Sequence, residues 1–360
     1  MSANHPKIVL TGGGTAGHVT PNLALLPHLL EEGFEAAYVG SKTGIEKTIL
    51  ADLPELPYTG ISTGKLRRYF DWKNFTDPFR VIRGYREAKR FLKQYKPDAV
   101  FSKGGYVSVP VVRAAHALRI PCIIHESDMT PGLANKLCFG SAEKICCNFP
   151  ETVEMLPPGK AILTGTPIRE GLFHGDRRRG LAMCGFTEDK PVLMIMGGSQ
   201  GAAAVNDAVR AHLDELLARF QIVHLCGKGK LDEALKDRAG YVQFEYISDE
   251  LPDLFAAADL MLSRAGANAI CEILALRKPN LLVPLPTGGS RGDQILNARS
   301  FEKLGYSMVV ENAALEGCIV QKLDELYSGR ERYEEAMAKS SQSEAIPIIM
   351  GLIREVTGKR

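Results

Sequence analysis

Short apolar runs rich in β-branched residues recur along the chain and alternate with segments of helical periodicity. Such continuous runs are typical of parallel strands that are buried on both faces. We therefore expect strands at residues 8–10, 36–39, 99–101, 122–125, 144–148, 161–164, 192–196, 222–225, 242–246, 260–263 and 280–283. This alternation of strand and helix predicts an α/β protein with parallel sheets.

The alternation starts twice, which predicts two doubly wound parallel-sheet domains. The second series begins near residue 190 with the apolar run 192–196, a glycine-rich turn at 197–201 and a helical pattern at 202–219. Pro167 and the basic segment 176–180 interrupt the pattern before it, so we expect the boundary there. Ligands in such sheets bind at the carboxyl ends of the strands.

The first expected strand leads into a glycine-rich turn, Gly-Gly-Gly-Thr-Ala-Gly-His at residues 12–18. Glycines let the backbone turn tightly and approach a ligand closely. A turn before a helix also directs N–H groups at an anion. His18 stands at the mouth of the helix that follows, where an imidazole indicates nearby chemistry. Pro27 inside that helical pattern should bend the helix or remove one backbone hydrogen bond.

The same turn also fits GxGxxG, the fingerprint of dinucleotide-binding proteins. A dinucleotide site needs an acidic residue at the end of the second strand, but Gly40, Ser41 and Lys42 follow that strand. From the turn alone, a nicotinamide or flavin oxidoreductase and a non-catalytic nucleotide-binding module stay open as alternatives. A non-catalytic His18 also stays open from the turn alone.

Polar residues follow several other expected strands, and each group has both a functional and a structural interpretation. They are Gly104-Gly105-Tyr106, His125 to Asp128, Ser199-Gln200, Arg264 to Glu272 and Asp293-Gln294. Each could line a ligand site, or could be a plain turn, a helix cap or a carboxylate that favours a helix dipole. His125-Glu126 does not begin HExxH, because Met129 stands at the second histidine position, so a zinc protease is excluded.

Composition places the chain among soluble globular proteins, with 360 residues, 45% apolar and 24% charged. We expect neither a transmembrane helix nor a signal peptide, because no apolar run is long enough. The eight cysteines show neither CxxC nor a zinc spacing. We expect them to be reduced and buried, as in a cytoplasmic protein.

Positive charge gathers between residues 65 and 96, where eleven basic residues face three acidic ones. A solvated helix face, an anionic membrane surface and nucleic acid are the competing interpretations, and no nucleic-acid-binding motif is present. Aromatic side chains among the cations favour the membrane. The candidate membrane residues are Lys65, Arg67, Arg68, Tyr69, Phe70, Trp72, Lys73 and Phe75.

Together these motifs resemble the MurG family, GT-B glycosyltransferases that add N-acetylglucosamine (GlcNAc) to lipid I in peptidoglycan synthesis. The matching segments follow the family's order over nearly the whole chain: 12–18, 104–106, 125–136, 165–169, 197–201, 264–272 and 293–298. The resemblance implies two Rossmann-like domains facing across a cleft. Residues 1–165, with 343–360 packing back, would bind the acceptor and the membrane. Residues 166–342 would bind the UDP-sugar donor.

The resemblance also implies the reaction and the roles of residues. GlcNAc would pass from UDP-GlcNAc, with inversion, to the C4 hydroxyl of the MurNAc-pentapeptide on undecaprenyl diphosphate, with His18 as the general base. Donor contacts would be Thr15, Ala16, Gly17, Asp128, Arg169, Ser199, Gln200, Ile247, Ala267, Asn268, Ala269, Ile270, Cys271, Glu272, Asp293 and Gln294. Acceptor contacts would be Gly13, Gly14, Gly104, Gly105, Tyr106 and Glu126. Asp128 replaces an asparagine of the family's His-Glu-Gln-Asn motif.

No cofactor and no bound metal are expected, because the chain has no Asp-x-Asp motif. The expected partners are UDP-GlcNAc, lipid I, an anionic membrane surface and other cell-wall synthesis or division proteins, without nucleic acid. The protein would lie peripherally on the cytoplasmic face of the bacterial cell membrane. A GT-B enzyme that makes another glycolipid and a UDP-sugar epimerase are the neighbouring alternatives.

Overall fold

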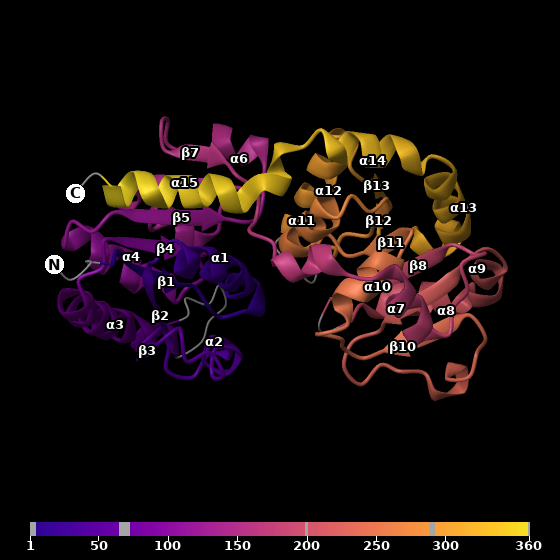
Figure 1. Ribbon diagram of the computed structural model, residues 1–360, viewed down its shortest axis with the longest axis horizontal. Helices are drawn as coiled ribbons and strands as arrows, with labels where there is room; N and C mark the ends of the chain where they lie inside the picture. The colour runs from indigo at the N-terminus through magenta and orange to yellow at the C-terminus, as the bar shows by residue number, and fades with distance from the viewer. Residues whose placement is uncertain (1–4, 65–72, 199–200, 288–291, 359–360) are drawn as a thin grey trace. The chain divides into compact units, whose positions relative to one another are not determined.

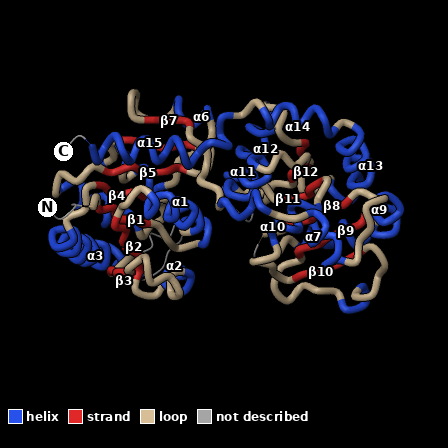
Figure 2. The backbone as a smooth tube through the Cα atoms, viewed as in Figure 1, coloured by secondary structure: helices blue, strands red, loops and turns tan. Residues whose placement is uncertain are grey.

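The structure, a computed structural model, describes residues 5–64, 73–198, 201–287 and 292–358 (Figure 1). It divides into two compact units, residues 1–169 with 344–360 and residues 170–343. The division falls after Arg169, between Pro167 and the basic segment 176–180. Each unit is a parallel sheet with helices on its faces (Figure 2).

The first unit contains a seven-stranded parallel sheet with the strand order β3-β2-β1-β4-β5-β6-β7. Its strands are β1 (Lys7–Thr11), β2 (Glu35–Ser41), β3 (Tyr58–Ile61), β4 (Ala99–Ser102), β5 (Cys122–Glu126), β6 (Lys144–Cys147) and β7 (Ala161–Leu163). All but β3 were expected. This edge strand escaped the apolar pattern because it is short, only half-buried over three residues, and interrupted by Gly60.

The second unit contains a six-stranded parallel sheet with the order β10-β9-β8-β11-β12-β13. Its strands are β8 (Val192–Met196), β9 (Gln221–Leu225), β10 (Tyr241–Phe244), β11 (Leu260–Ser263), β12 (Asn280–Leu282) and β13 (Met308–Val309). Only β13 was missed, because two residues carry no recognisable period. The expected α/β class with two doubly wound sheets is confirmed.

Helices connect the strands in both units. In the first they are α1 (Thr20–Glu31), α2 (Ile45–Ile49), α3 (Lys73–Tyr95), α4 (Ser108–Ala117), α5 (Leu133–Lys136), α6 (Pro150–Glu154) and α15 (Ala345–Gly358). In the second they are α7 (Arg177–Cys184), α8 (Ala203–Ala211), α9 (Leu213–Arg219), α10 (Leu251–Ala257), α11 (Ala267–Ala275), α12 (Asp293–Lys303), α13 (Leu315–Ser328) and α14 (Arg330–Ala338). The expected continuous helix at 202–219 is therefore wrong, since it is divided at His212. Pro27 lies inside α1 on its exposed side.

Two apolar cores cover the two faces of the first sheet. Ile8 and Leu10 belong to the core under α1 and α15, whereas Val9 belongs to the core under α3 and α4. This alternation follows from the two-residue period of a strand. The C-terminal helix α15 completes the first core with Ile349 and Ile353, so the end of the chain returns to the first unit (Figure 1).

All eight cysteines lie within the described residues, and all are free thiols, seven of them buried. Burial raises the pKa of Cys138 to about 12 and that of Cys184 to about 11. They are packing residues rather than ligands or disulfide partners. Over the described ranges, no helix combines the length and the apolar character that crossing a bilayer requires.

Candidate functional site

Each sheet reverses its strand order at one point, between β1 and β4 in the first unit and between β8 and β11 in the second. At such a switch point the connections leave in opposite directions, which opens a crevice at the carboxyl ends of the two strands. The glycine-rich turns after β1 and β8 therefore stand at the position where open α/β sheets bind ligands.

In the first unit, the turn after β1 packs against the turn after β4. A Cβ atom on Gly105 would collide with the carbonyl oxygen of Gly13 and would lie 3.2 Å from His18 Nδ1. A Cβ atom on Gly14 would lie 2.6 Å from Cε1 of Tyr106. Gly14 and Gly105 also have positive φ angles of 88° and 83°. Only glycine permits this approach of the two turns.

His18 is half-buried and ends a single 3-10 turn, Ala16–His18, directly before α1. Its Nδ1 atom lies 3.0 Å from Oγ1 of Thr15. If Nδ1 donates to this hydroxyl, Nε2 carries the lone pair, which is the form that a general base needs. Thr15, expected as a donor contact, is thus also a side-chain partner of His18.

Buried polar side chains that the sequence did not single out hold this turn. The Tyr38 hydroxyl donates to Gly12 O at 2.9 Å, and Asn22 Nδ2 donates to Thr11 O at 3.2 Å. Gly14 N donates to the Glu46 carboxylate at 3.2 Å. We expected the N–H groups of this turn to bind an anion. At Gly14 the N–H group instead binds a carboxylate of the same chain, that of Glu46.

Glu126, an expected acceptor contact, is buried at the end of β5. It accepts hydrogen bonds from Asn135 Nδ2 and Gly132 N, both at 2.9 Å, and from Asp128 N at 3.2 Å. Burial raises the pKa of this carboxyl group, and these hydrogen bonds oppose the shift. Glu126 therefore shapes the loop that carries Asp128 and leads into α5. That helix is a single turn that ends at Lys136.

A buried lysine beside this loop links the end of β4 to β5 and to the segment after β7. Lys103, which is 1% exposed, donates from Nζ to Nδ1 of His125 at 2.9 Å and to the Ser127 hydroxyl. Nε2 of His125 then donates to the carbonyl oxygen of Gly165 at 2.8 Å. Burial and the Lys103 charge hold the pKa of His125 well below its usual value. His125 is therefore a neutral structural bridge.

In the second unit, Ser199 and Gln200 lie outside the described residues. The rest of their turn is closed by Gly201, whose φ is 66° and whose Cβ position is taken by the Cys226 carbonyl. Arg169, the last residue of the first unit, is exposed. Ile247 is half-buried in the segment after β10.

The expected donor contacts in α11, which follows the turn after β11, fall into a buried group and a partly exposed group. Ile270 is fully buried and Cys271 is 4% exposed, so their side chains belong to the core. Ala267 is also buried, whereas Asn268, Ala269 and Glu272 are partly exposed and could reach a ligand. The buried residues Ala267, Ile270 and Cys271 could contact a ligand only through backbone atoms.

Polar side chains hold the segments that follow β11 and β12 in place. Arg264, 9% exposed, donates to Val283 O at 3.0 Å and to Asn312 Oδ1 at 2.7 Å, and burial lowers its pKa. Oε1 of Gln294 accepts from Leu285 N at 3.0 Å. Gln294, expected as a donor contact, thus positions the segment after β12. Asp293 is the first residue of α12.

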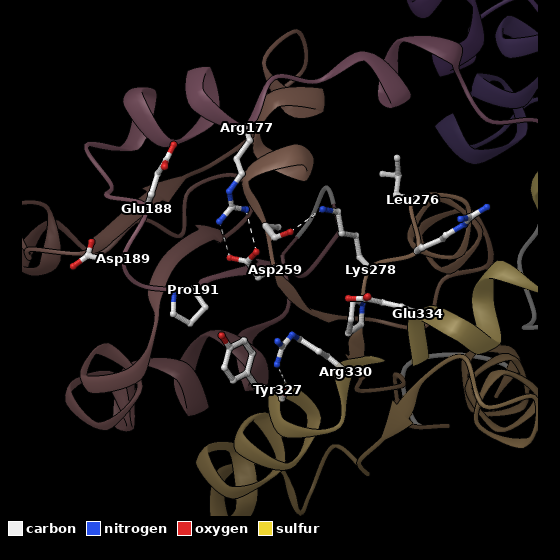
Figure 3. Close-up of a pocket in the computed structure, with 13 residues that line it drawn as sticks. Arg177, Glu188, Asp189, Pro191, Asp259, Leu276, Lys278, Tyr327, Arg330 and Glu334 are labelled. Carbon is white, nitrogen blue, oxygen red and sulfur yellow. Dashed lines mark hydrogen bonds and ion pairs between the residues drawn. The ribbon is translucent and has the colours of Figure 1, made fainter. Parts of the chain in front are cut away.

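A cavity of about 370 Å³ in the second unit lies at the other end of the sheet, where β8, β11 and β12 begin (Figure 3). Arg177 forms two hydrogen bonds with the Asp259 carboxylate, at 3.0 and 3.1 Å, and Lys278 donates to Ala258 O at 2.8 Å. These contacts tie α7 to the start of β11. Over the described part of the chain, no three acidic, histidine or cysteine side chains cluster as a metal site would require.

The candidate membrane residues 65–72 lie outside the described residues, and Lys73 and Phe75 lie in the first turn of α3. Farther along α3, Phe79 is 74% exposed and Ile82 is 50% exposed. The neighbouring basic residues Arg80 and Arg83 are also exposed. α3 thus presents apolar and cationic side chains together.

Two parallel-sheet units, each with a glycine-rich turn at its switch point, are the architecture of the GT-B glycosyltransferases, as expected. Residues 8–147 match the N-terminal domain of glycosyltransferase family 28, and residues 192–350 match its C-terminal domain. The chain belongs to glycosyltransferase family 28.

Similarity to individual proteins extends over the full length. The chain is 61% identical to the UDP-N-acetylglucosamine–N-acetylmuramyl-(pentapeptide) pyrophosphoryl-undecaprenol N-acetylglucosamine transferase of Lachnospira eligens, covering 97% of this chain and 99% of that protein. It is 60% identical to the enzyme of the same name from Lachnoclostridium phytofermentans, with 97% and 99% coverage. The crystal structure of Acinetobacter baumannii MurG matches with a TM-score of 0.76 at 27% identity, covering 97% of this chain and 99% of that one.

Proposed function

We propose that this chain transfers GlcNAc from UDP-GlcNAc to the C4 hydroxyl of the MurNAc-pentapeptide carried by undecaprenyl diphosphate. The full-length relatives at about 60% identity are named for this transfer. Within this chain, the observation that carries the proposal is the placement of His18 where the two glycine-rich turns of the first unit meet.

In this mechanism the acceptor C4 oxygen attacks C1 of GlcNAc while the bond from C1 to the UDP oxygen breaks. A single displacement inverts the configuration at C1. His18 Nε2 takes the proton of the C4 hydroxyl as the oxygen attacks, and Thr15 Oγ1 accepts from Nδ1 to keep the imidazole in that tautomer. The departing UDP carries the negative charge that the bond leaves behind.

The second unit would hold the donor. The partly exposed side chains of Asn268 and Glu272 are suited to a polar ligand, with Glu272 accepting from the ribose hydroxyls. The N–H groups of the glycine-rich turn after β8 would stabilise the departing diphosphate. The proposal includes no metal ion and no cofactor.

The acceptor carries a long lipid, so the enzyme must work at a membrane surface. We assign attachment to residues 65–75 together with the exposed part of α3, where Phe79 and Ile82 stand among basic side chains. Apolar side chains that insert beside cations match an anionic leaflet, which supports peripheral attachment on the cytoplasmic side of the cell membrane.

The base assignment is tested with His18→Ala, with His28→Ala in the helix that follows, α1, as the control. Removing a general base costs roughly 10²–10⁴ in rate. We expect that loss in kcat for His18→Ala, unchanged affinity for UDP-GlcNAc measured by calorimetry, and wild-type kcat for His28→Ala. Turnover near wild type in His18→Ala would show that another group takes the proton.

The membrane assignment is tested by sedimentation with phosphatidylglycerol vesicles. Charge reversal at Arg67, Arg68 and Lys73 should weaken binding, because each cation near an anionic surface contributes about 1 kcal/mol. A matched reversal of three exposed lysines in the second unit, Lys228, Lys236 and Lys339, should leave binding unchanged. Equal effects of the two triple variants would contradict the assignment.

A further inference from the structure

A buried carboxylate supports the glycine-rich turn that carries His18. Glu46, in α2, is fully buried. Its Oε1 atom accepts hydrogen bonds from Ser41 N at 2.9 Å and from the Ser41 hydroxyl at 2.5 Å. Its Oε2 atom accepts from Gly14 N at 3.2 Å. Among the described residues, no basic side chain forms an ion pair with it.

The two oxygens of this carboxylate join two loops that are far apart in sequence. One oxygen binds the end of β2, and the other binds the turn after β1. A buried carboxylate without an ion pair is costly unless hydrogen bonds satisfy it, and here the donors are two backbone N–H groups and one hydroxyl. The position of Gly14 is thereby tied to the position of Ser41.

Two glycines make room for the carboxylate. A Cβ atom on Gly13 would lie 2.6 Å from Cδ of Glu46, and a Cβ atom on Gly44 would overlap the carboxylate oxygens. On its other side, Gly13 contacts Gly105, and Gly14 contacts the Tyr106 ring. The turn is therefore held between Glu46 and the turn after β4.

His18 lies on the same turn, four residues after Gly14, the residue that contacts Glu46. Thr15 follows Gly14 directly; its carbonyl accepts from His18 N at 3.1 Å, and its hydroxyl lies 3.0 Å from His18 Nδ1. A shift of Gly14 therefore moves Thr15 and, through both contacts, the imidazole.

We propose that Glu46 is a positioning residue, which holds the turn so that His18 reaches the acceptor hydroxyl. This inference rests on the proposed function, since it presupposes that His18 is the base. Glu46 also takes the place that a phosphate oxygen would occupy at Gly14 N, so substrate phosphates are bound by other donors. Its role is exerted through the backbone of the turn and requires no contact with substrate.

The first test is Glu46→Gln. Each carboxylate oxygen faces a backbone N–H group, whereas an amide offers only one oxygen, so its NH₂ group must face either Gly14 N or Ser41 N. The turn then shifts. Because misplacing a reacting group by about 1 Å can cost about 10²-fold, we expect a decrease of that order in kcat. The KM for UDP-GlcNAc should stay within about twofold, since most of the expected donor contacts lie in the second unit.

Asp98→Asn is the matched control. Asp98 also accepts from a backbone N–H group, that of Lys7 at 2.8 Å, but it does so at the opposite end of β1. The same change from carboxylate to amide there should leave kcat unchanged, even where the melting temperature falls. A purely structural role for Glu46 would give that same result in Glu46→Gln.

Gly44→Ala provides a second perturbation that leaves the carboxylate in place. Gly44 has a φ of −83°, which alanine adopts readily, so the main effect is the new Cβ against the Glu46 carboxylate and the Ser41 hydroxyl that it binds. We expect a lower kcat with an unchanged KM for UDP-GlcNAc. This variant carries the test if Glu46→Gln does not fold.

A double-mutant cycle identifies the group through which Glu46 acts. In a His18→Ala background, Glu46→Gln should lower kcat by less than twofold, because the base that it positions is absent. Wild-type kcat in Glu46→Gln or Gly44→Ala, or a full additive loss in the double variant, would overturn the inference. Wild-type turnover in His18→Ala would instead overturn the proposed base and leave any Glu46→Gln effect to be assigned to another group.

Discussion

The attachment of α3 to the first unit depends on Glu87, and replacing Glu87 by glutamine should weaken it. The Glu87 carboxylate accepts from Lys42 Nζ at 2.8 Å and from Ser62 N at 2.5 Å. Burial alone would raise the pKa of Glu87, but these hydrogen bonds outweigh it and lower the pKa to about 2. They join α3 to the ends of β2 and β3.

The size of the effect follows from this shift. Lowering the pKa from 4.5 to about 2 corresponds to about 3.4 kcal/mol of preference for the charged form in the folded state. The Glu87 side chain is 25% exposed, so solvent screening reduces this value, and we expect about 2 kcal/mol. Because the folded pKa is the lower one, the contribution is complete above pH 4.5 and is lost as the pH falls toward 2.

The assay is urea unfolding of the wild type and Glu87→Gln between pH 7 and pH 3, followed by far-ultraviolet circular dichroism. The difference in unfolding free energy should be about 2 kcal/mol at pH 7 and less than half of that at pH 3. Glu55→Gln, at an exposed position, should show no difference. If the two proteins had equal unfolding free energies at pH 7, or if the difference stayed constant down to pH 3, the reasoning would be refuted.

Three further predictions concern the site. Thr15→Val should lower kcat about fivefold, the equivalent of about 1 kcal/mol for the lost hydrogen bond to His18, while Thr15→Ser should restore it; equal kcat values would contradict the tautomer assignment. Lys103→Met should lower the free energy of unfolding by about 1–3 kcal/mol in urea titrations, because His125 loses a buried partner, and an unchanged midpoint would be the contrary result. UDP-GlcNAc at 100 times its dissociation constant should stabilise the protein by about 2.7 kcal/mol with or without EDTA; stabilisation abolished by EDTA and restored by Mg²⁺ would show that a metal is required.

The strands show how well the apolar pattern of the sequence predicts secondary structure. β8 and β11 were predicted to the residue, because parallel strands buried on both faces are continuous apolar runs. The edge strand β3 and the two-residue β13 were missed, because neither is both long enough and buried enough to show a period. The expected single helix over 202–219 failed because no residue type marks the break at His212.

The candidate site was partly predictable for a similar reason. The glycine-rich turn of the first unit and His18 were recognisable, because glycines at close approaches and a histidine before a helix are local signals. Glu46 and Lys103 gave no such signal. Glu46 is 32 residues from its partner Gly14, and Lys103 is 22 residues from His125. Their importance arises from contacts between segments that only the fold brings together.

The sequence by itself determined the α/β class, the two sheets and the turns at the ends of their strands, since burial on both faces and backbone freedom depend on residue type and spacing. Only the tertiary structure decided how those turns are supported. It assigned Glu126 to a buried loop, placed Ile270 and Cys271 in the core and brought Glu46 to Gly14. Local pattern cannot reveal these partners, because a buried polar group is satisfied by whichever donor the fold brings beside it.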